Sequence, residues 1–340
     1  MYRAEDRAGL LPAHARLRAV RREDAVHRAW SLPLTATETA VLRTLAYADV
    51  FDFPLDRNEV FRYCVSPGGT RREVDAAIDQ LLERGRICTV GRHLFLPGRE
   101  ITVFCRRSLA PPSRRAWRTA HRWGRVLWAL PFVRMVAVTG SLAVESKRAD
   151  QDIDFLVVAA PNRLWLTRGL CLLVWRVARL LGVRLCPNYL VTTRALAVGQ
   201  RDLYTARELV QMVPLHGRDV ACRFGETNRW SLDFLPNARV DAAGASDTQS
   251  PPARAFKRWA ERLLAGPPAD RLEGWERRRK VARLEAAGTG ESLFTADVCK
   301  DHGHAHGRRV LDEYALRLAA LDQLEDEEPA PAGERLAAAN

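Results

Sequence analysis

The sequence has no C-x-x-C pair, although it contains seven cysteines. An odd number of cysteines without such spacing argues against both a disulfide framework and a zinc-finger type of site. The first twenty residues are charged throughout and lack the apolar core of a signal peptide. We therefore expect reduced thiols and a cytoplasmic protein.

Long uninterrupted hydrophobic runs are also missing. The most apolar segment, 164–181, carries Arg168, Arg176 and Arg179, so we expect no membrane span. At about 100° per residue, the three arginines fall within roughly a quarter turn of a helix. The segment is therefore predicted to be an amphipathic helix with one buried face. No internal repeat is visible.

What the sequence does contain is enough apolar material for a full core. Hydrophobic residues make up 47% of the 340 residues, which excludes a disordered chain and allows two domains with a helical appendage. The formal net charge is +12, most of it from arginine. A basic balance favours encounters with phosphate-bearing partners, although it does not define a fold.

Composition and pattern divide the chain into six segments. Each is distinguished by its charge, its periodicity or its content of Gly, Pro and Ser. They are a flexible arm (1–32), a small helical unit (33–100), an α/β core with a leading basic helix (101–236), a linker (237–252), a helical region (253–326) and a disordered tail (327–340).

The small unit 33–100 has three helix starts with the spacing of a capping box, in which a side chain at the helix start and one three residues later each bond the other's backbone N–H. Downstream, ICTVGRHLFL reads as two short strands around a tight turn. The order of three helices and a hairpin resembles a winged helix-turn-helix. The three capping pairs are Thr35 with Glu38, Asp56 with Glu59, and Thr70 with Glu73.

DNA binding by this unit is possible but not favoured. A helix that reads DNA presents a basic surface to the phosphates. The third helix, 70–84, instead has three arginines against four acidic residues, a sum of about −1. The alternative is that the unit packs on the rest of the chain or on a partner.

The segment 101–135 has eight arginines, three tryptophans and no acidic residue. It is predicted to be a helix that leads into the first strand of the core. Arginine suits bidentate contacts with phosphate, so the segment is a candidate polyanion site. The simpler interpretation is a helix with a solvated basic face and tryptophans in the core.

Strand and helix patterns alternate in the core. Alternation of this kind predicts an α/β unit with a mixed sheet. The predicted strands are 135–139, 153–159 and 183–192, and the predicted helices begin at Ser141 and cover 164–181, 204–213 and 218–234.

Two short motifs in this core indicate chemistry. The first is Gly140-Ser141, after an apolar run, and the second is Asp152 and Asp154 within the next apolar run. Side chains two apart on a strand point to one face, so the two carboxylates are expected to lie together. A Gly-Ser turn that enters a helix offers backbone N–H groups and a hydroxyl to an anion. Together these parts suit a metal-bound triphosphate.

This arrangement resembles the DNA polymerase β-like nucleotidyltransferase superfamily, in identity and in spacing. It departs from the superfamily's pattern at Glu145, where a glycine is usual, and at Gln151, where a serine is frequent. The resemblance implies transfer of a nucleoside monophosphate from a nucleoside triphosphate, expected to be ATP, to a hydroxyl. It also implies Mg²⁺, or Mn²⁺, as the cofactor. The acceptor would be a small molecule, a protein side chain or an RNA end.

The resemblance also assigns roles to residues. Asp152 and Asp154 would bind the metal and serve catalysis, and Gly140 and Ser141 would hold the phosphates. Further expected nucleotide-binding residues are Lys147, Arg148 and Asn188.

A third carboxylate is frequent on the following strand in active members of the superfamily. Asn188 occupies that place here, and asparagine can ligate a metal but cannot accept a proton at neutral pH. We expect Glu208 to be the third catalytic residue, and Glu145 is the alternative. The alternative function is a catalytically impaired regulator, or an antitoxin-like binding protein, that uses the winged-helix-like unit.

Two further patterns remain. His302, His304 and His306 alternate as metal ligands on a strand would, but we favour a polar helix start.

Blocks such as CPNYL and LYTARELVQMVPL look like those of a little-characterised bacterial group of nucleotidyltransferase-domain proteins. That likeness extends over much of the chain and indicates no substrate.

Overall fold

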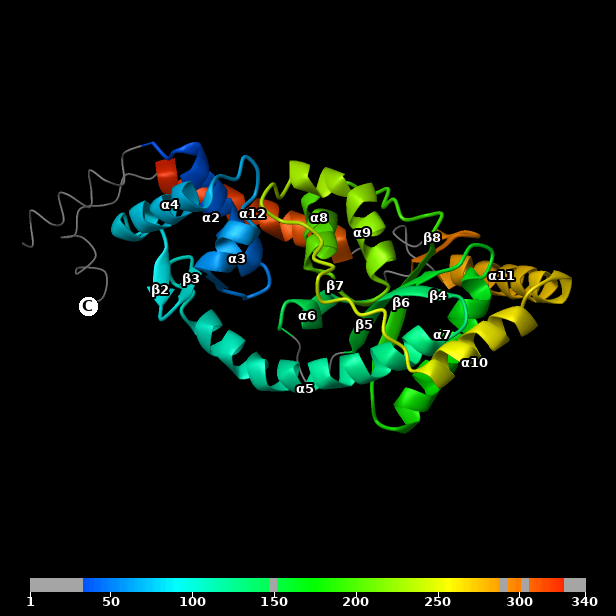
Figure 1. The fold of residues 1–340 in the computed structure, drawn as a ribbon. Coiled ribbons are helices and arrows are strands. Elements are labelled where there is room, and N and C mark those ends of the chain that lie inside the picture. Colours follow the sequence, from blue (N-terminus) through cyan, green and yellow to red (C-terminus); the bar gives the residue numbers. More distant parts are fainter. Residues whose placement is uncertain (1–32, 147–151, 288–292, 301–305, 327–340) are drawn as a thin grey trace, which may run out of the picture.

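The computed structural model describes residues 33–146, 152–287, 293–300 and 306–326 (Figure 1). The fold is mixed α/β, with a small N-terminal unit, a six-stranded mixed sheet and C-terminal helices. The predicted flexible arm 1–32 and tail 327–340 lie outside the described residues. No two cysteines of the described chain are joined by a disulfide.

The N-terminal unit contains three helices and a three-stranded sheet. The helices are α2 (Ala36–Asp49), α3 (Arg57–Arg62) and α4 (Arg71–Glu83). Each begins with the predicted capping box, and both bonds of all three boxes are present. Helix α4 buries Val74, Ile78 and Leu81 on one face, whereas Leu82 is only partly covered.

The predicted hairpin of this unit is confirmed. Strands β2 (Cys88–Val90) and β3 (His93–Phe95) pair antiparallel around Gly91-Arg92, and Gly91 has the positive φ of a tight turn. A two-residue strand, β1 (Leu55–Asp56), adds to the other side of β3. We did not predict β1 from the sequence, because two residues are too few to show the alternation of a strand.

The basic segment forms one helix, α5 (Ile101–Ala129), which runs from the N-terminal unit to the sheet (Figure 1). Trp123 is buried in the core, and Trp117 and Trp128 pack against it. Arg114, Arg118 and the other arginines in the middle of the helix are exposed. This burial favours the simpler of the two interpretations, a solvated basic face with tryptophans in the core.

The sheet of the core has the strand order β7-β4-β5-β6-β9-β8. Only β5 and β6 run parallel, so the sheet is mixed, as predicted. The strands are β7 (Val213–His216), β4 (Val133–Thr139), β5 (Ile153–Ala159), β6 (Leu185–Thr192), β9 (Val298–Lys300) and β8 (Leu293–Phe294).

Helices cover both faces of the sheet, which is why β4 and β5 are apolar on both sides. Val136 and Val138 of β4 pack with α5 and with α7 (Leu164–Leu180). Met135 and Ala137 face the opposite way, toward α8 (Leu203–Gln211) and α9 (Arg218–Thr227). The predicted burial of one face of α7 is seen at Leu164, Trp165, Thr167, Cys171 and Ala178.

Three predicted boundaries were wrong. Helix 204–213 ends at Gln211, because Val213–His216 joins the sheet as the edge strand β7, where Pro214 is tolerated. Helix 218–234 ends at Thr227 and continues as a separate 3₁₀ turn, Arg229–Asp233. Region 253–326 was expected to be helical with a break around 288–292, but two strands that were not predicted follow this break: β9 pairs with β6, and β8 pairs with β9.

The segment predicted as a linker, 237–252, is irregular as far as Ser250 but lies against the core. Asp247 Oδ1 accepts the backbone N–H of Gly217 at 2.9 Å, and the carbonyl of Ser246 lies 2.7 Å from His216 Nδ1. It leads into α10 (Pro251–Leu263) and then α11 (Pro267–Ala287).

The last helix, α12 (His306–Asp326), returns to the N-terminal unit and lies against both α2 and α8 (Figure 1). Arg317 of α12 donates to Asp49 at 2.9 Å, and Arg99 donates to the other oxygen of Asp49 at 2.6 Å. The rings of Tyr47 and Tyr314 meet edge to face at 5.4 Å. The C-terminal helix therefore ties the N-terminal unit to the core.

We predict that Gly217→Ala destabilises the fold by about 3 kcal/mol or more, since it combines backbone strain with an overlap that cannot relax locally. Gly217 has φ +85°, and a Cβ atom there would lie 2.2 Å from the backbone oxygen of Arg134. Urea denaturation measures the change. Gly199→Ala is the control, because a Cβ at Gly199 meets nothing within 4 Å. Equal stability of the two variants would contradict the prediction.

Candidate functional site

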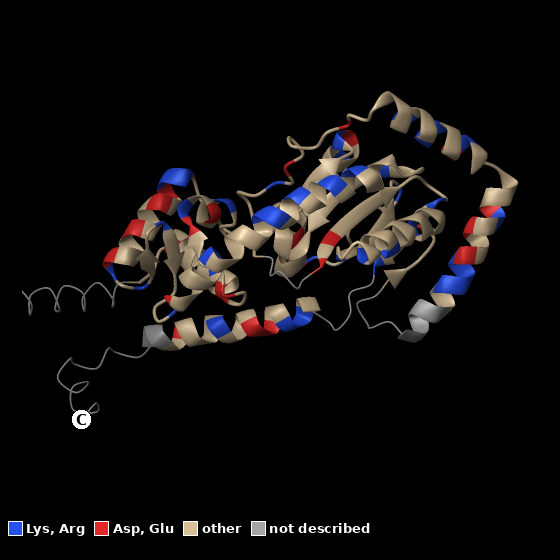
Figure 2. Cartoon of the chain, turned by 90° about the horizontal axis from the view of Figure 1, so that it is seen from below, with Lys and Arg blue, Asp and Glu red and all other residues tan. Residues whose placement is uncertain are grey.

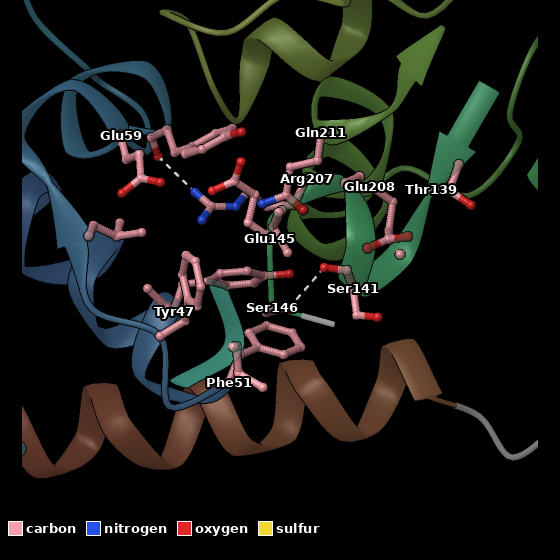
Figure 3. A pocket seen from close by; sticks show the side chains of 18 of the residues that line it. Tyr47, Phe51, Glu59, Thr139, Ser141, Glu145, Ser146, Arg207, Glu208 and Gln211 are labelled. Atoms are coloured by element: carbon pink, nitrogen blue, oxygen red, sulfur yellow. Dashed lines mark hydrogen bonds between the residues drawn. The ribbon is translucent and has the colours of Figure 1, made fainter. Parts of the chain in front are cut away.

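A cavity of about 980 Å³ lies between the N-terminal unit and one end of the sheet (Figure 3). Its lining includes both predicted motifs, Gly140-Ser141 and the Asp152/Asp154 pair. Side chains from α2 and α3 form the wall opposite the motifs. The cavity is therefore shared between the N-terminal unit and the core.

The Gly-Ser turn and the aspartate strand meet because β4 and β5 are paired. In that pairing Thr139, at the end of β4, lies opposite Asp154. Gly140 follows with φ +65°, and a Cβ atom on it would lie 2.6 Å from Asp154 Oδ2. Only glycine fits this position, for its backbone angle and for the space that the carboxylate occupies.

The turn after Gly140 is closed by its own hydrogen bonds. A single turn of helix, α6 (Gly140–Ala143), follows the strand. The carbonyl of Ser141 accepts the backbone N–H of Ser146 at 2.9 Å and its hydroxyl at 3.2 Å. Glu145, with φ +56°, is held by the Ser113 hydroxyl, which donates to its carbonyl at 2.9 Å. Glu145 also lines the cavity.

Asp152 and Asp154 share one side of the chain, as predicted. Ile153 between them and Phe155 after them are buried, whereas Asp152 is exposed and Asp154 partly exposed. Both carboxylates line the cavity. Their placement follows from the period of two along a strand whose other face belongs to the core.

Glu208 joins these aspartates from α8. It is partly buried and lines the same cavity. Burial first, and then the negative charge of Asp154, raise the pKa of Glu208 to about 7, although the positive charges of Lys300 and Arg207 act in the opposite direction. The three carboxylates predicted as catalytic are thus brought to one cavity.

The donor set suits a hard divalent cation by its chemistry. Mg²⁺ prefers carboxylate oxygens, and a cation would relieve the repulsion between Glu208 and Asp154 that, after burial, is the second cause of the raised pKa of Glu208. Within the described parts of the chain, however, no three Asp, Glu, His or Cys side chains are gathered closely enough to hold a metal as they stand.

Several predicted residues cannot be placed in this site. Lys147 and Arg148 lie outside the described residues, as do His302 and His304. The backbone of Asn188 belongs to β6, but its side chain is likewise outside the described part. His306 begins α12, lines the cavity and lies edge-on to the ring of Tyr204 at 5.8 Å.

We did not predict from the sequence that aromatic rings and arginines would together form the N-terminal wall of the cavity. Tyr47, Phe51 and Arg207 line this wall (Figure 3), and so do Tyr63 and Arg106. These residues are distant in the sequence from the two motifs, so only the packing of the unit on the core reveals them.

Arg207 is the most buried charge of this wall, at 4% exposure. Its guanidinium lies 4.2 Å from the centre of the Tyr63 ring and donates to the carbonyl of Tyr63 at 3.3 Å. Its Nε has no hydrogen-bond partner in the described chain. Arg106 makes a two-pronged contact with Glu59, both distances 2.6 Å.

The contacts of α4 bear on the question of DNA. Arg71 pairs with Asp75 at 2.6 Å, and Arg57 of α3 pairs with Asp79. These arginines are therefore partly neutralised by acids of α4 itself. The unit packs on the core through α12, in agreement with the alternative to DNA binding.

Comparison with known proteins adds nothing to this geometry: no protein-family model, no curated protein and no solved structure matches the chain.

We predict that the free energy of unfolding of Glu208→Gln, relative to that of the wild type, is greater at pH 8 than at pH 5. A carboxyl whose folded pKa is raised favours folding at low pH, and this contribution is lost as the pH rises from about 4.5 toward 7. Glutamine does not titrate, so the stability of the variant relative to the wild type should rise across this range, by at most about 3 kcal/mol.

Urea denaturation at several pH values without divalent ions measures this difference. Glu226→Gln serves as the control, because Glu226 is exposed and its partner Arg229 is exposed too. A stability difference between Glu208→Gln and the wild type that does not change with pH would contradict the prediction.

Proposed function

We propose that the protein is a nucleotidyltransferase of the polymerase β-like kind, which moves a nucleoside monophosphate from a triphosphate to a hydroxyl. The observation that carries the proposal is the contact between the two motifs. Gly140 lies directly against the carboxylate of Asp154, so the phosphate-binding turn and the carboxylates share one end of the cavity.

In this proposal Asp152 and Asp154 hold Mg²⁺ or Mn²⁺. When bound, the cation supplies charge stabilisation for the attacking and leaving oxygens. The Ser141 hydroxyl and the backbone N–H groups of the turn hold the phosphates of the triphosphate, expected to be ATP. Lys147, Arg148 and Asn188 remain proposed nucleotide-binding residues.

Glu208 is proposed as the group that accepts the proton of the acceptor hydroxyl. A general base works best when its pKa lies near the operating pH, and a pKa of about 7 meets that condition. Glu208 and Asp154 line the same cavity, which supports Glu208 as the third carboxylate in place of Asn188.

The shape of the cavity favours a small acceptor. Its volume of about 980 Å³ lies at the upper end of the range for small-molecule sites, which leaves room for a nucleotide and a second small ligand. Its far wall is formed by Tyr47 and Tyr63 of the winged-helix-like unit, together with Arg207 of α8. We propose that this unit faces the acceptor rather than DNA.

A second candidate function is a regulator or antitoxin-like protein that keeps the fold without turnover. One observation favours it: no metal-binding group of three is already assembled among the described residues. Such a protein would bind a nucleotide through Gly140-Ser141 but would transfer nothing.

We predict that Asp152→Ala/Asp154→Ala abolishes transfer. Each α-labelled nucleoside triphosphate is incubated with the protein, Mg²⁺ or Mn²⁺ and a cell extract, and label in larger products is measured. The wild type should label an acceptor, and the double variant should lose at least about a hundredfold, as removal of the metal-binding groups would.

The matched control is Asp219→Ala/Asp233→Ala, since both aspartates are exposed and neither lines the cavity. Equal labelling by the wild type and the Asp152/Asp154 variant would contradict the enzyme. An absence of any label, with retained binding of the triphosphate, would favour the regulator.

We also predict that Gly140→Ala weakens binding of a magnesium–triphosphate complex by about tenfold or more, because the new methyl group displaces the Asp154 carboxylate and strains the turn. Calorimetry with a non-hydrolysable ATP analogue measures this affinity. Gly199→Ala should bind as the wild type does, and an unchanged affinity of Gly140→Ala would show that the turn does not hold the phosphates.

A further inference from the structure

Helix α10 packs on the protein with its polar side. Lys257 Nζ donates to the carbonyls of Trp128 and Val133 at 2.9 and 2.8 Å and lies 4.1 Å from the centre of the Trp128 ring. Glu261 accepts the backbone N–H of Phe132 at 2.7 Å. This burial is the reverse of an ordinary surface helix, whose apolar side faces the core.

The apolar side of α10 consequently points outward. Phe256, Trp259 and Leu263 follow one another at helical spacing and are 55%, 58% and 66% exposed. Single exposed apolar residues need no explanation, but a row of three with two aromatic rings does. Leu272 and Trp275 of α11 are also half exposed, at 44% and 52%.

A row of arginines flanks this apolar row. Arg254, Arg258 and Arg262 are four residues apart and exposed. Between 251 and 263 the only acidic residue is Glu261, and it is paired inward with Arg134 at 2.7 Å. The exposed half of α10 is therefore apolar and positively charged, without a compensating acid. Figure 2 shows α10 and α11 at the outer edge of the molecule, beyond the sheet.

These properties match a surface of lipid better than a second copy of the chain. A twofold pairing through α10 would bring two rows of arginines near each other. In a bilayer interface, by contrast, Trp and Phe enter the headgroup boundary while flanking arginines meet anionic lipids. No helix of the described chain is both long and apolar enough to cross a bilayer, so any attachment through its helices would be peripheral.

We propose that α10 binds the surface of an anionic membrane, with Phe256, Trp259 and Leu263 inserted at the interface and the arginine row on the lipid headgroups. Lys257 and Glu261 attach α10 to the rest of the protein, so the helix is already folded before it meets a membrane. This inference is independent of the proposed transfer reaction.

The test is flotation of the full-length protein with vesicles of phosphatidylcholine alone and of phosphatidylcholine mixed with phosphatidylglycerol. Binding is expected only to the anionic vesicles and should fall at high salt. Phe256→Ser/Trp259→Ser should reduce binding at least about tenfold. Arg254→Gln/Arg258→Gln should reduce it roughly 25-fold, at about fivefold for each arginine.

Matched controls test whether the loss of vesicle binding is specific to α10, or whether removing any exposed apolar residue or arginine has the same effect. Ile101→Ser/Phe104→Ser removes two residues at the N-terminal end of α5 that are at least as exposed as Phe256 and Trp259, at 63% and 66%. Arg114→Gln/Arg118→Gln removes the same charge from the middle of that helix. Both controls should bind vesicles as the wild type does, and the thermal stability of all four variants should be unchanged.

Three results would overturn the proposal. The first is no binding to anionic vesicles, and the second is an equal loss in the control variants. The third is a dimer of the wild type, seen by light scattering, that Phe256→Ser/Trp259→Ser converts to monomer, because the face would then be an interface between copies.

Discussion

The pairing of β4 with β5 is the constraint on which the rest of the site depends. It sets Thr139 opposite Asp154 and therefore brings Gly140 against the Asp154 carboxylate. A shift of this register by one residue would turn the carboxylates toward the core that β5 shares with α5 and α7, and Phe155 away from that core. The packing opposes such a shift because each face has its own set of side chains, one packed with α5 and α7 and the other with α8 and α9.

The second wall of the cavity depends on a different set of contacts, made by polar groups at long sequence separation. Asp49 binds Arg99 and Arg317 at once, and so links α2 to the start of α5 and to α12. Burial of Arg207 between Tyr47 and Tyr63 then joins α8, which carries Glu208, to the N-terminal unit. The group proposed as the base and the wall proposed to face the acceptor thus belong to one packed unit. A movement of the wall would therefore also move the helix that carries Glu208.

Much of the fold could be predicted from patterns within short stretches of the sequence. The three capping boxes are contained within four residues each, and the strand 153–159 is apolar at every position except Asp154, so both could be predicted from the sequence. Strands β7, β8 and β9 were not, because two to four residues hold no period and their pairing partners lie far along the chain. At the site, Asp152, Asp154 and Gly140 followed from spacing, whereas the wall with Arg106 and Arg207 arises only when distant segments pack.

The two surfaces singled out in the molecule are physically separate. Among the described residues, the lining of the cavity comes from the N-terminal unit, α5, the motif strands, β6, the α6 turn, α8 and the start of α12, and none of it from α10 or α11. A ligand in the cavity therefore need not compete with a surface that covers Trp259. Because α10 is attached through Trp128 and Val133, next to the first strand of the motif, attachment at α10 would hold the sheet, and with it the cavity, at a fixed distance from that surface.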